Sequence, residues 1–203
     1  KETLIVVTGD HETGGLTLGF SGTKYSTYFK NLKGQKQSYI AFDETFDVWR
    51  KANAGAPFEK VVPMIEESFG LKVPTEADLA EMKKAGDNAD YAKSIGSAYD
   101  MHLKDFELEE LKAAYGRSMS GQKVEGGKDY LLYGSYEPFT VTLTHLLNQK
   151  AGLAWTSYSH TGVPVLTSAT GAGAQSFAGF YDNTAMFTKF MDVLGLKATV
   201  ASK

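Results

Sequence analysis

One stretch decides the fold of this chain: Leu4-Ile5-Val6-Val7-Thr8-Gly9-Asp10-His11-Glu12-Thr13-Gly14-Gly15. Its apolar run, Leu4–Val7, predicts a buried parallel β-strand, because such strands are continuous aliphatic segments. Asp10 and His11 follow at the predicted carboxyl end of this strand, where open α/β sheets place their functional groups. The stretch therefore predicts an α/β fold and a functional site that begins at Asp10.

Asp10 and His11 supply an oxygen donor and a nitrogen donor side by side. Such a pair suits zinc better than calcium or magnesium, and Gly14 and Gly15 allow the backbone behind it to bend. An alternative interpretation is an aspartate that caps the following turn beside a hydrogen-bonded histidine. The pair alone leaves both interpretations open.

Further zinc ligands have to come from the four histidines, because the chain contains no cysteine. The lack of cysteine also excludes disulfides and cysteine nucleophiles. His160 is the natural third ligand, because it too follows a β-rich segment and precedes a glycine and a predicted core strand. His102 is expected to be a partly buried histidine on a helical stripe, and His145 to lie off the apolar face of a helix.

The composition is that of an ordinary globular protein. Of 203 residues, 42% are hydrophobic and 22% are charged, with a formal net charge of −3. This balance, without any basic cluster, predicts no nucleic-acid partner. No apolar stretch approaches the ~18 residues of a spanning helix, so we expect no membrane span. Because no strand–helix crossover precedes the predicted strand at Leu4, we expect the later part of a longer protein.

A largely helical segment, 43–128, is predicted between two parts that are rich in strand and loop. Within it, apolar residues recur at helical spacing over three ranges: 58–69, 91–106 and 108–115. Thr75 followed by Asp78 predicts a further helix start. A short strand is expected just before the segment, near 38–42. We interpret the segment as an insertion that caps the domain rather than carries the catalysis.

Helix and strand alternate again after the helical segment. A helix is expected to begin near Pro138. The aliphatic run 163–166 predicts a second buried strand. A last helix should open at Asp182 or Asn183 and end at Gly195. This helix is expected to bury its apolar residues, Met186, Phe187, Phe190, Met191 and Leu194.

Taken together, these landmarks resemble those of the alkaline phosphatases. Segment 8–15 is similar to the Asp-His-Glu-Thr-Gly-Gly motif that follows a core strand in that family, and 159–165 is similar to its His-Thr-Gly motif. Other landmarks follow in the family's order: the loop 171–173, the stretch 177–179 and the helix start at 182–184. The resemblance covers roughly 1–42 and 130–195, and the helical middle does not contribute to it.

The resemblance implies a fold, a reaction and a ligand set. The fold would be the C-terminal part of a three-layer α/β/α sandwich over 1–203, with 43–128 as its helical insertion. The parent would hydrolyse small phosphate monoesters with two zinc ions. Asp10 and His11 would bind the zinc that holds the phosphoserine oxygen, and His160 the zinc that activates water.

Further features of the parent follow from the same resemblance. A Mg²⁺ ion, with ligands mainly outside this chain, would complete the metal cluster. The parent would be periplasmic or extracellular and could be a homodimer.

The chain lacks other parts of the family's pattern. It contains no Asp-Ser-Ala-type nucleophile motif, and its two arginines, Arg50 and Arg117, both fall in the predicted insertion. Three ligands divided over two sites also fall short of the three protein ligands that a catalytic zinc keeps. We therefore expect a fragment that is inactive alone, with its serine nucleophile outside this chain.

Two alternatives stay open. A phosphodiesterase, sulfatase or phosphomutase would share the superfamily core and a similar Asp-His pair, and its nucleophile would distinguish it. A non-catalytic binding module would use Asp10, His11 and His160 only structurally. The Glu-Thr-Gly-Gly continuation at 12–15 favours an alkaline phosphatase over the related hydrolases.

Overall fold

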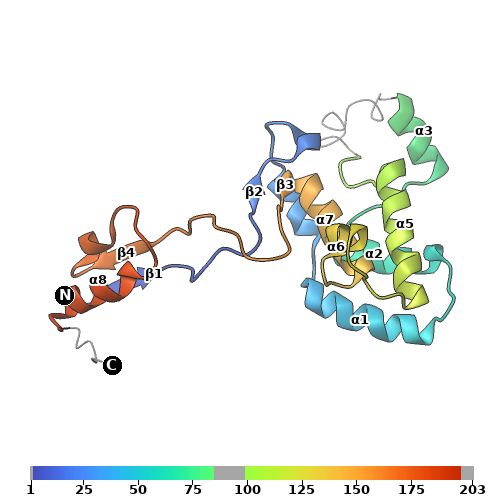
Figure 1. The fold of residues 1–203 in the computed structure, drawn as a ribbon. Helices are drawn as coiled ribbons and strands as arrows, with labels where there is room; N and C mark the ends of the chain where they lie inside the picture. The colour runs from blue at the N-terminus through green and yellow to red at the C-terminus, as the bar shows by residue number, and fades with distance from the viewer. Residues whose placement is uncertain (1, 85–98, 198–203) are drawn as a thin grey trace. The chain divides into compact units, whose positions relative to one another are not determined.

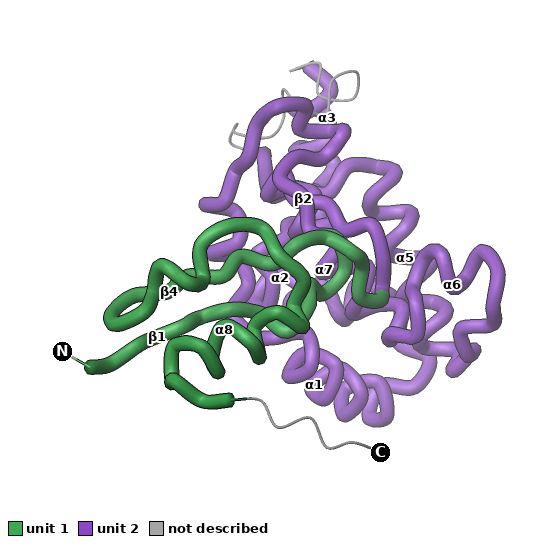
Figure 2. Tube along the Cα trace, turned by 60° about the vertical axis from the view of Figure 1, so that its left-hand side comes forward, with its two compact units in different colours: residues 1–15, 159–203 green, residues 16–158 purple. Residues whose placement is uncertain are grey.

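The computed structural model describes residues 2–84 and 99–197, and the chain divides into two compact units (Figures 1 and 2). Unit 1 joins 1–15 to 159–203, whereas unit 2 is the continuous segment 16–158. The described residues are mixed α and β, mostly helical with small antiparallel sheets, and they do not by themselves form three layers. None of the described helices combines the length and the apolarity needed to cross a bilayer.

A two-stranded antiparallel sheet forms the centre of unit 1. β1 (Leu4–Val7) pairs along its whole length with β4 (Ser168–Gly171), although the two strands are far apart in the sequence. Gly171 is required at the end of this ladder, because its φ is 99° and a Cβ atom would overlap the Thr3 carbonyl oxygen. That carbonyl instead accepts a hydrogen bond of 3.0 Å from the Ala172 N–H, which extends the pairing.

The prediction of a buried parallel strand at 4–7 is wrong on both counts. β1 is antiparallel to β4, and its side chains alternate between half-buried and exposed, with Ile5 55% and Val7 65% exposed. An apolar run does not reveal the direction of the neighbouring strand, which only tertiary pairing decides. Because successive side chains point to opposite faces, every second one stays accessible when one face is covered.

Two helices follow the sheet within unit 1. η4 (Ala174–Phe177) contacts both strands of the sheet and also α8 (Ala185–Leu194). Phe177 is buried and packs against Phe190 of α8, with ring centroids 4.9 Å apart. This aromatic contact is the apolar centre of unit 1.

The predicted end of the last helix at Gly195 is confirmed, but the helix begins at Ala185, two to three residues after the predicted start, and its predicted burial is wrong. The Asp182 carboxylate accepts hydrogen bonds from Thr184 just before α8, and Gly195 ends the helix at a φ of 65°. Within α8, which is described throughout, no residue is buried, and Phe187 and Leu194 are 62% and 65% exposed. The apolar face therefore exists as the periodicity indicates, but the described part of unit 1 does not cover it.

The buried strand predicted over 163–166 is also wrong. This segment has no regular secondary structure, and Val163 and Leu166 are 51% and 83% exposed. β4 instead begins at Ser168, in a less apolar stretch. Pairing with β1, rather than hydrophobicity, selects the strand.

The core of unit 2 lies between four helices (Figure 1): α1 (Tyr39–Ala52), α2 (Val62–Phe69), α5 (Asp105–Ser120) and α7 (Pro138–Ala151). α7 contacts the other three and buries residues around most of its circumference, so it is the central helix. The core is rich in aromatic side chains, and its members are Phe42, Phe46, Phe58, Val61, Ile65, Phe69, Leu71, Leu103, Leu111, Tyr115, Phe139, Leu143, Leu146 and Leu147.

The two ends of unit 2 lie beside each other. β2 (Thr17–Leu18) pairs antiparallel with β3 (Leu153–Ala154), and the Gly19 N–H donates to the Gly152 carbonyl at 2.7 Å. The chain therefore enters and leaves unit 2 at the same place. Further helices of the unit are η1 (Ser21–Thr23), η2 (Phe29–Gly34), η3 (Phe58–Lys60), α3 (Glu76–Lys84) and α6 (Lys128–Tyr133).

Most of the predicted helices of unit 2 are confirmed. The range 58–69 forms η3 and α2, the range 108–115 lies within α5, and α7 begins at Pro138. Thr75 and Asp78 exchange hydrogen bonds ahead of α3, as a helix start requires. These predictions rested on local signals, periodicity and capping, that tertiary packing does not override.

Two local predictions in unit 2 are wrong. The strand expected near 38–42 is the first turn of α1, because the Ser38 hydroxyl accepts the Ala41 N–H at 3.2 Å and caps the helix. In the helix expected over 91–106, Tyr91 and Ile95 lie outside the described residues. His102, farther along the same range, forms a β-bridge with Lys72 instead of a helical turn.

A buried ion pair joins α5 to α7. The Lys150 ammonium lies 2.7 Å from the Glu107 carboxylate, and the two side chains are only 1% and 0% exposed. Glu107 also accepts the backbone N–H of Lys104 at 2.8 Å. A buried charge without its partner is costly, so this pair links the two helices strongly.

We expect Lys150→Met to destabilise the chain by about 3–5 kcal/mol, because it leaves the Glu107 carboxylate buried without its ammonium. Equilibrium unfolding in urea measures the loss. The matched control is Lys51→Met, which breaks the exposed ion pair with Asp47 and should cost about 1 kcal/mol or less. Equal losses in both variants would contradict the assignment of the buried pair.

Candidate functional site

Unit 1 brings the three predicted ligands together. Asp10 and His11 lie in the loop that follows β1, and His160 lies in the segment that leads to β4. The imidazole rings of His11 and His160 stack, with centroids 3.5 Å apart and planes inclined by 25°. The sequence identified these residues, and the β1–β4 pairing places them side by side.

Hydrogen bonds fix the orientation of the Asp10-His11 pair. The Asp10 carboxylate accepts the His11 backbone N–H at 3.0 Å, and this bond lowers the pKa of the Asp10 carboxyl below its ordinary value. The His11 Nδ1 lies 2.7 Å from the Glu12 carbonyl oxygen. Because a carbonyl can only accept, Nδ1 carries a proton, which leaves Nε2 as the ring nitrogen that can bind a metal ion.

The Nε2 of His11 and the Oδ2 of Asp10 suit a zinc ion in chemistry and in spacing. The His11 Nε2 and the Asp10 Oδ2 are 3.4 Å apart. Two ligands bonded to zinc at tetrahedral angles are about 3.3–3.4 Å apart. The hydrogen bond from the other ring nitrogen to a backbone carbonyl is the usual companion of a metal-bound histidine. Asp10 and His11 therefore fit a zinc ion as two of its ligands.

The described residues do not supply a complete metal site. Within 2–84 and 99–197, no three His, Cys, Asp or Glu side chains converge on one point that could hold a metal. His160 stacks on the ring of His11 rather than adding a third donor to the pair. The site is also open to solvent, since the Asp10 side chain is 88% exposed and that of His11 is 41% exposed.

Contacts between the two segments of unit 1 hold the backbone around the site. The hydroxyl groups of Thr8 and Thr167 lie 2.8 Å apart, just beyond the β1–β4 ladder. A Cβ atom at Gly9 would lie 3.3 Å from the His11 carbonyl oxygen and 3.6 Å from Val165, so the backbone approaches closely there. The loop that carries Asp10 is thus packed against the segment that follows His160.

Sequence reasoning missed the role of Glu12. One oxygen of its carboxylate, Oε2, accepts the N–H groups of Gly14 and Gly15. The other oxygen, Oε1, accepts the N–H of Thr161, the residue after His160. The Glu-Thr-Gly-Gly order at 12–15 could have indicated the hydrogen bonds to Gly14 and Gly15, because these residues are near neighbours in the sequence. Nothing in the sequence indicated the bond to Thr161, because it depends on the tertiary pairing.

The other two histidines lie in unit 2. Burial lowers the pKa of His145, whose ring centroid is 5.7 Å from that of Tyr158. Burial also lowers the pKa of His102, which packs edge-on against Tyr99 with centroids 5.2 Å apart. Their surroundings are those of structural histidines.

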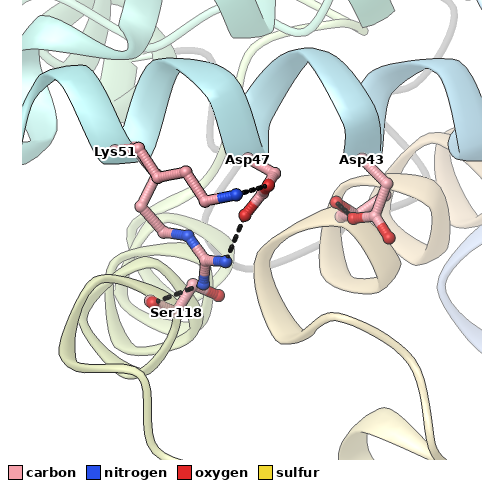
Figure 3. A network of polar contacts seen from close by, with 6 residues as sticks. Asp43, Asp47, Lys51 and Ser118 are labelled. Atoms are coloured by element: carbon pink, nitrogen blue, oxygen red, sulfur yellow. Dashed lines mark hydrogen bonds and ion pairs between the residues drawn. The ribbon is translucent and has the colours of Figure 1, made fainter.

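Both arginines are held by hydrogen bonds within unit 2. Arg50 contacts the Asp47 carboxylate at 2.6 Å and the Ser118 carbonyl at 3.0 Å, in the network of Figure 3 that also includes Lys51. Arg117 donates to the Lys123 carbonyl at 2.7 Å and to the Asp129 carboxylate. Each guanidinium therefore has a structural role.

Comparison with known proteins identifies the family of this chain. The family model described as alkaline phosphatase matches residues 1–196. The chain belongs to the alkaline phosphatase family.

A solved structure supports the fold. The crystal structure of a cold-active alkaline phosphatase from the psychrophile Shewanella sp. is similar, with a TM-score of 0.51 and 24% sequence identity. The match covers 94% of this chain and 34% of that chain, so this chain spans about a third of the length of that relative. A comparison with curated proteins finds no match.

We expect His160→Ala to shift the ring proton resonances of His11 downfield, because the shielding by the stacked ring is lost. Proton NMR of the full chain measures the shift. The resonances of His145, in unit 2, serve as the internal reference and should stay in place. An unchanged His11 spectrum would contradict the stacking.

Proposed function

We propose that this chain is the C-terminal part of an alkaline phosphatase that hydrolyses small phosphate monoesters through a two-zinc site. The observation that carries the proposal is the Asp10-His11 pair, whose free oxygen and nitrogen are 3.4 Å apart, the spacing of two zinc ligands. The match of the family model over 1–196 supports the same reaction.

Asp10 and His11 would bind one zinc ion, and His160 would bind the other. The ring stacking supports this division. The lone pair of a ring nitrogen lies in the plane of its ring, and the planes of the two stacked rings are separated by about the distance between the rings. Such rings serve two neighbouring ions more easily than one. When bound, two zinc ions would stabilise the entering and leaving oxygens of phosphoryl transfer and lower the pKa of a water molecule.

The residues of this chain orient the donors. The Glu12 carbonyl holds the proton of His11 on Nδ1, so that Nε2, 3.4 Å from the Asp10 Oδ2, would be the donor atom toward a metal ion. The hydrogen bond from the His11 N–H lowers the pKa of the Asp10 carboxyl, so Asp10 is ionised and ready to bind a cation at neutral pH.

The remaining parts of the site would lie in the rest of the parent protein. They are a serine nucleophile, the further zinc ligands, and most ligands of a Mg²⁺ ion. The chain alone is then inactive, with its residues 1–203 as the C-terminal part of a three-layer sandwich and 43–128 as a helical insertion. The parent would act in the periplasm or outside the cell, and it could be a homodimer.

We expect Asp10→Asn, His11→Ala and His160→Ala each to lower kcat/KM for a phosphate monoester by orders of magnitude in the complete enzyme. Each variant removes one zinc ligand, and hydrolysis of p-nitrophenyl phosphate at alkaline pH measures the loss. Glu44→Gln, at an exposed position of unit 2, is the control and should hydrolyse normally. Normal hydrolysis in all three ligand variants would contradict the proposal.

The same assay separates the alternatives. A phosphodiesterase or a sulfatase would prefer a phosphate diester or a sulfate ester over the monoester, and a phosphomutase would transfer phosphate without net hydrolysis. A non-catalytic module would hydrolyse none of these substrates and would gain no thermal stability from added Zn²⁺.

A further inference from the structure

We propose that Glu12 is a positioning residue, which clamps the loop of Asp10 and His11 to the segment of His160. It would set the relative positions of the ligands of the two zinc ions without binding either ion. The clamp itself is a matter of geometry, whereas its effect on metal binding rests on the function proposed above.

Both oxygens of the Glu12 carboxylate are engaged, in two directions. Oε2 accepts the Gly14 N–H at 2.8 Å and also the Gly15 N–H, within the same loop. Oε1 accepts the N–H of Thr161, which is 149 residues away in the sequence. One side chain therefore closes its own loop and joins that loop to the residue next to His160.

The glycines make the first half of the clamp possible. Gly14 and Gly15 are buried and have φ values of 143° and 65°, which side-chain-bearing residues rarely adopt. In this turn two successive N–H groups point at one carboxylate oxygen, an arrangement that favours a bound negative charge. The motif order, a glutamate two and three residues before the glycines, thus has a physical reason.

The Glu12 carboxylate accepts three backbone N–H groups, those of Gly14, Gly15 and Thr161. A charged carboxylate is an acceptor only and makes stronger hydrogen bonds than a neutral group. With three N–H groups on its two oxygens, Glu12 is better placed to fix backbone than to bind a metal ion.

Glu12 also contacts the histidine pair through its backbone. Its carbonyl oxygen lies 2.7 Å from the His11 Nδ1, while its side chain holds Thr161, the residue after His160. Each of the two stacked rings therefore lies close to a hydrogen bond of Glu12: His11 makes one itself, and His160 precedes Thr161, which makes the other. Loss of the carboxylate would free one ring relative to the other and leave every zinc donor present.

The first experiment tests the clamp without metal. In ¹H–¹⁵N spectra of the full chain, we expect Glu12→Gln to move the amide resonances of Gly15 and Thr161 upfield, because their charge-assisted hydrogen bonds weaken. Glu2→Gln, an exposed position in the same unit, is the matched control and should leave both resonances in place. An unmoved Thr161 resonance in Glu12→Gln would overturn the clamp.

Glu12→Asp keeps the charge but shortens the side chain by one methylene. We expect it to retain the Gly14 and Gly15 contacts and to lose the contact with Thr161. It therefore tests the bridge even where Glu12→Gln disturbs the fold of unit 1, and a Thr161 amide unmoved in this variant would also overturn the bridge.

The second experiment tests positioning in the complete enzyme. We expect Glu12→Gln to weaken Zn²⁺ binding about 10–100-fold, the usual cost of losing a group that orients metal ligands. It should also alter the visible absorption of the Co²⁺-substituted enzyme, which reports the metal geometry. Equal affinity and an identical Co²⁺ spectrum would overturn the positioning role.

The two experiments distinguish this inference from the proposed function. A wild-type enzyme that binds no Zn²⁺ would overturn the proposed zinc site, whatever the amide spectra show. Spectra that confirm the bond to Thr161 would support the clamp on its own. Zinc binding that persists unchanged in Glu12→Gln would remove the positioning role and leave the zinc site intact.

Discussion

The candidate site depends on the pairing of β1 with β4. These strands belong to segments that are separated in the sequence by the whole of unit 2. Closing a long flexible loop between them would cost conformational entropy, and the cost grows with loop length. Unit 2 folds with its two ends beside each other, through β2, β3 and the Gly19–Gly152 hydrogen bond. A folded unit therefore replaces the flexible loop, and the two strands meet at a smaller entropic cost.

The chemistry of the site follows from this pairing and from a few local bonds. The ladder brings the loop after β1 next to the segment before β4, so His11 stacks on His160. Glu12 then fixes both segments through one charged side chain. The ligands of a metal ion gain from such fixation, because a preorganised site loses less entropy on binding. The surroundings of Asp10 are open, since its side chain is 88% exposed.

The local predictions succeeded where the signal was itself local. The capping pair Thr75 and Asp78 forms as expected, and so does the helix stop at Gly195, because both depend on neighbouring backbone groups. The predictions of burial failed in unit 1. Val163, Leu166 and Phe187 are apolar but exposed, because burial depends on what covers a face and not on the residue alone.

The sequence by itself determined the donor types and the family. Asp10, His11 and His160 could be named as candidate ligands from the order of the family's motifs, although the Asp10-His11 pair alone was equally compatible with a capped turn. Only the tertiary structure decided the strand direction, the stacking of the two histidines and the role of Glu12. These features depend on contacts between residues that are about 150 positions apart, and local sequence patterns carry no information on such contacts.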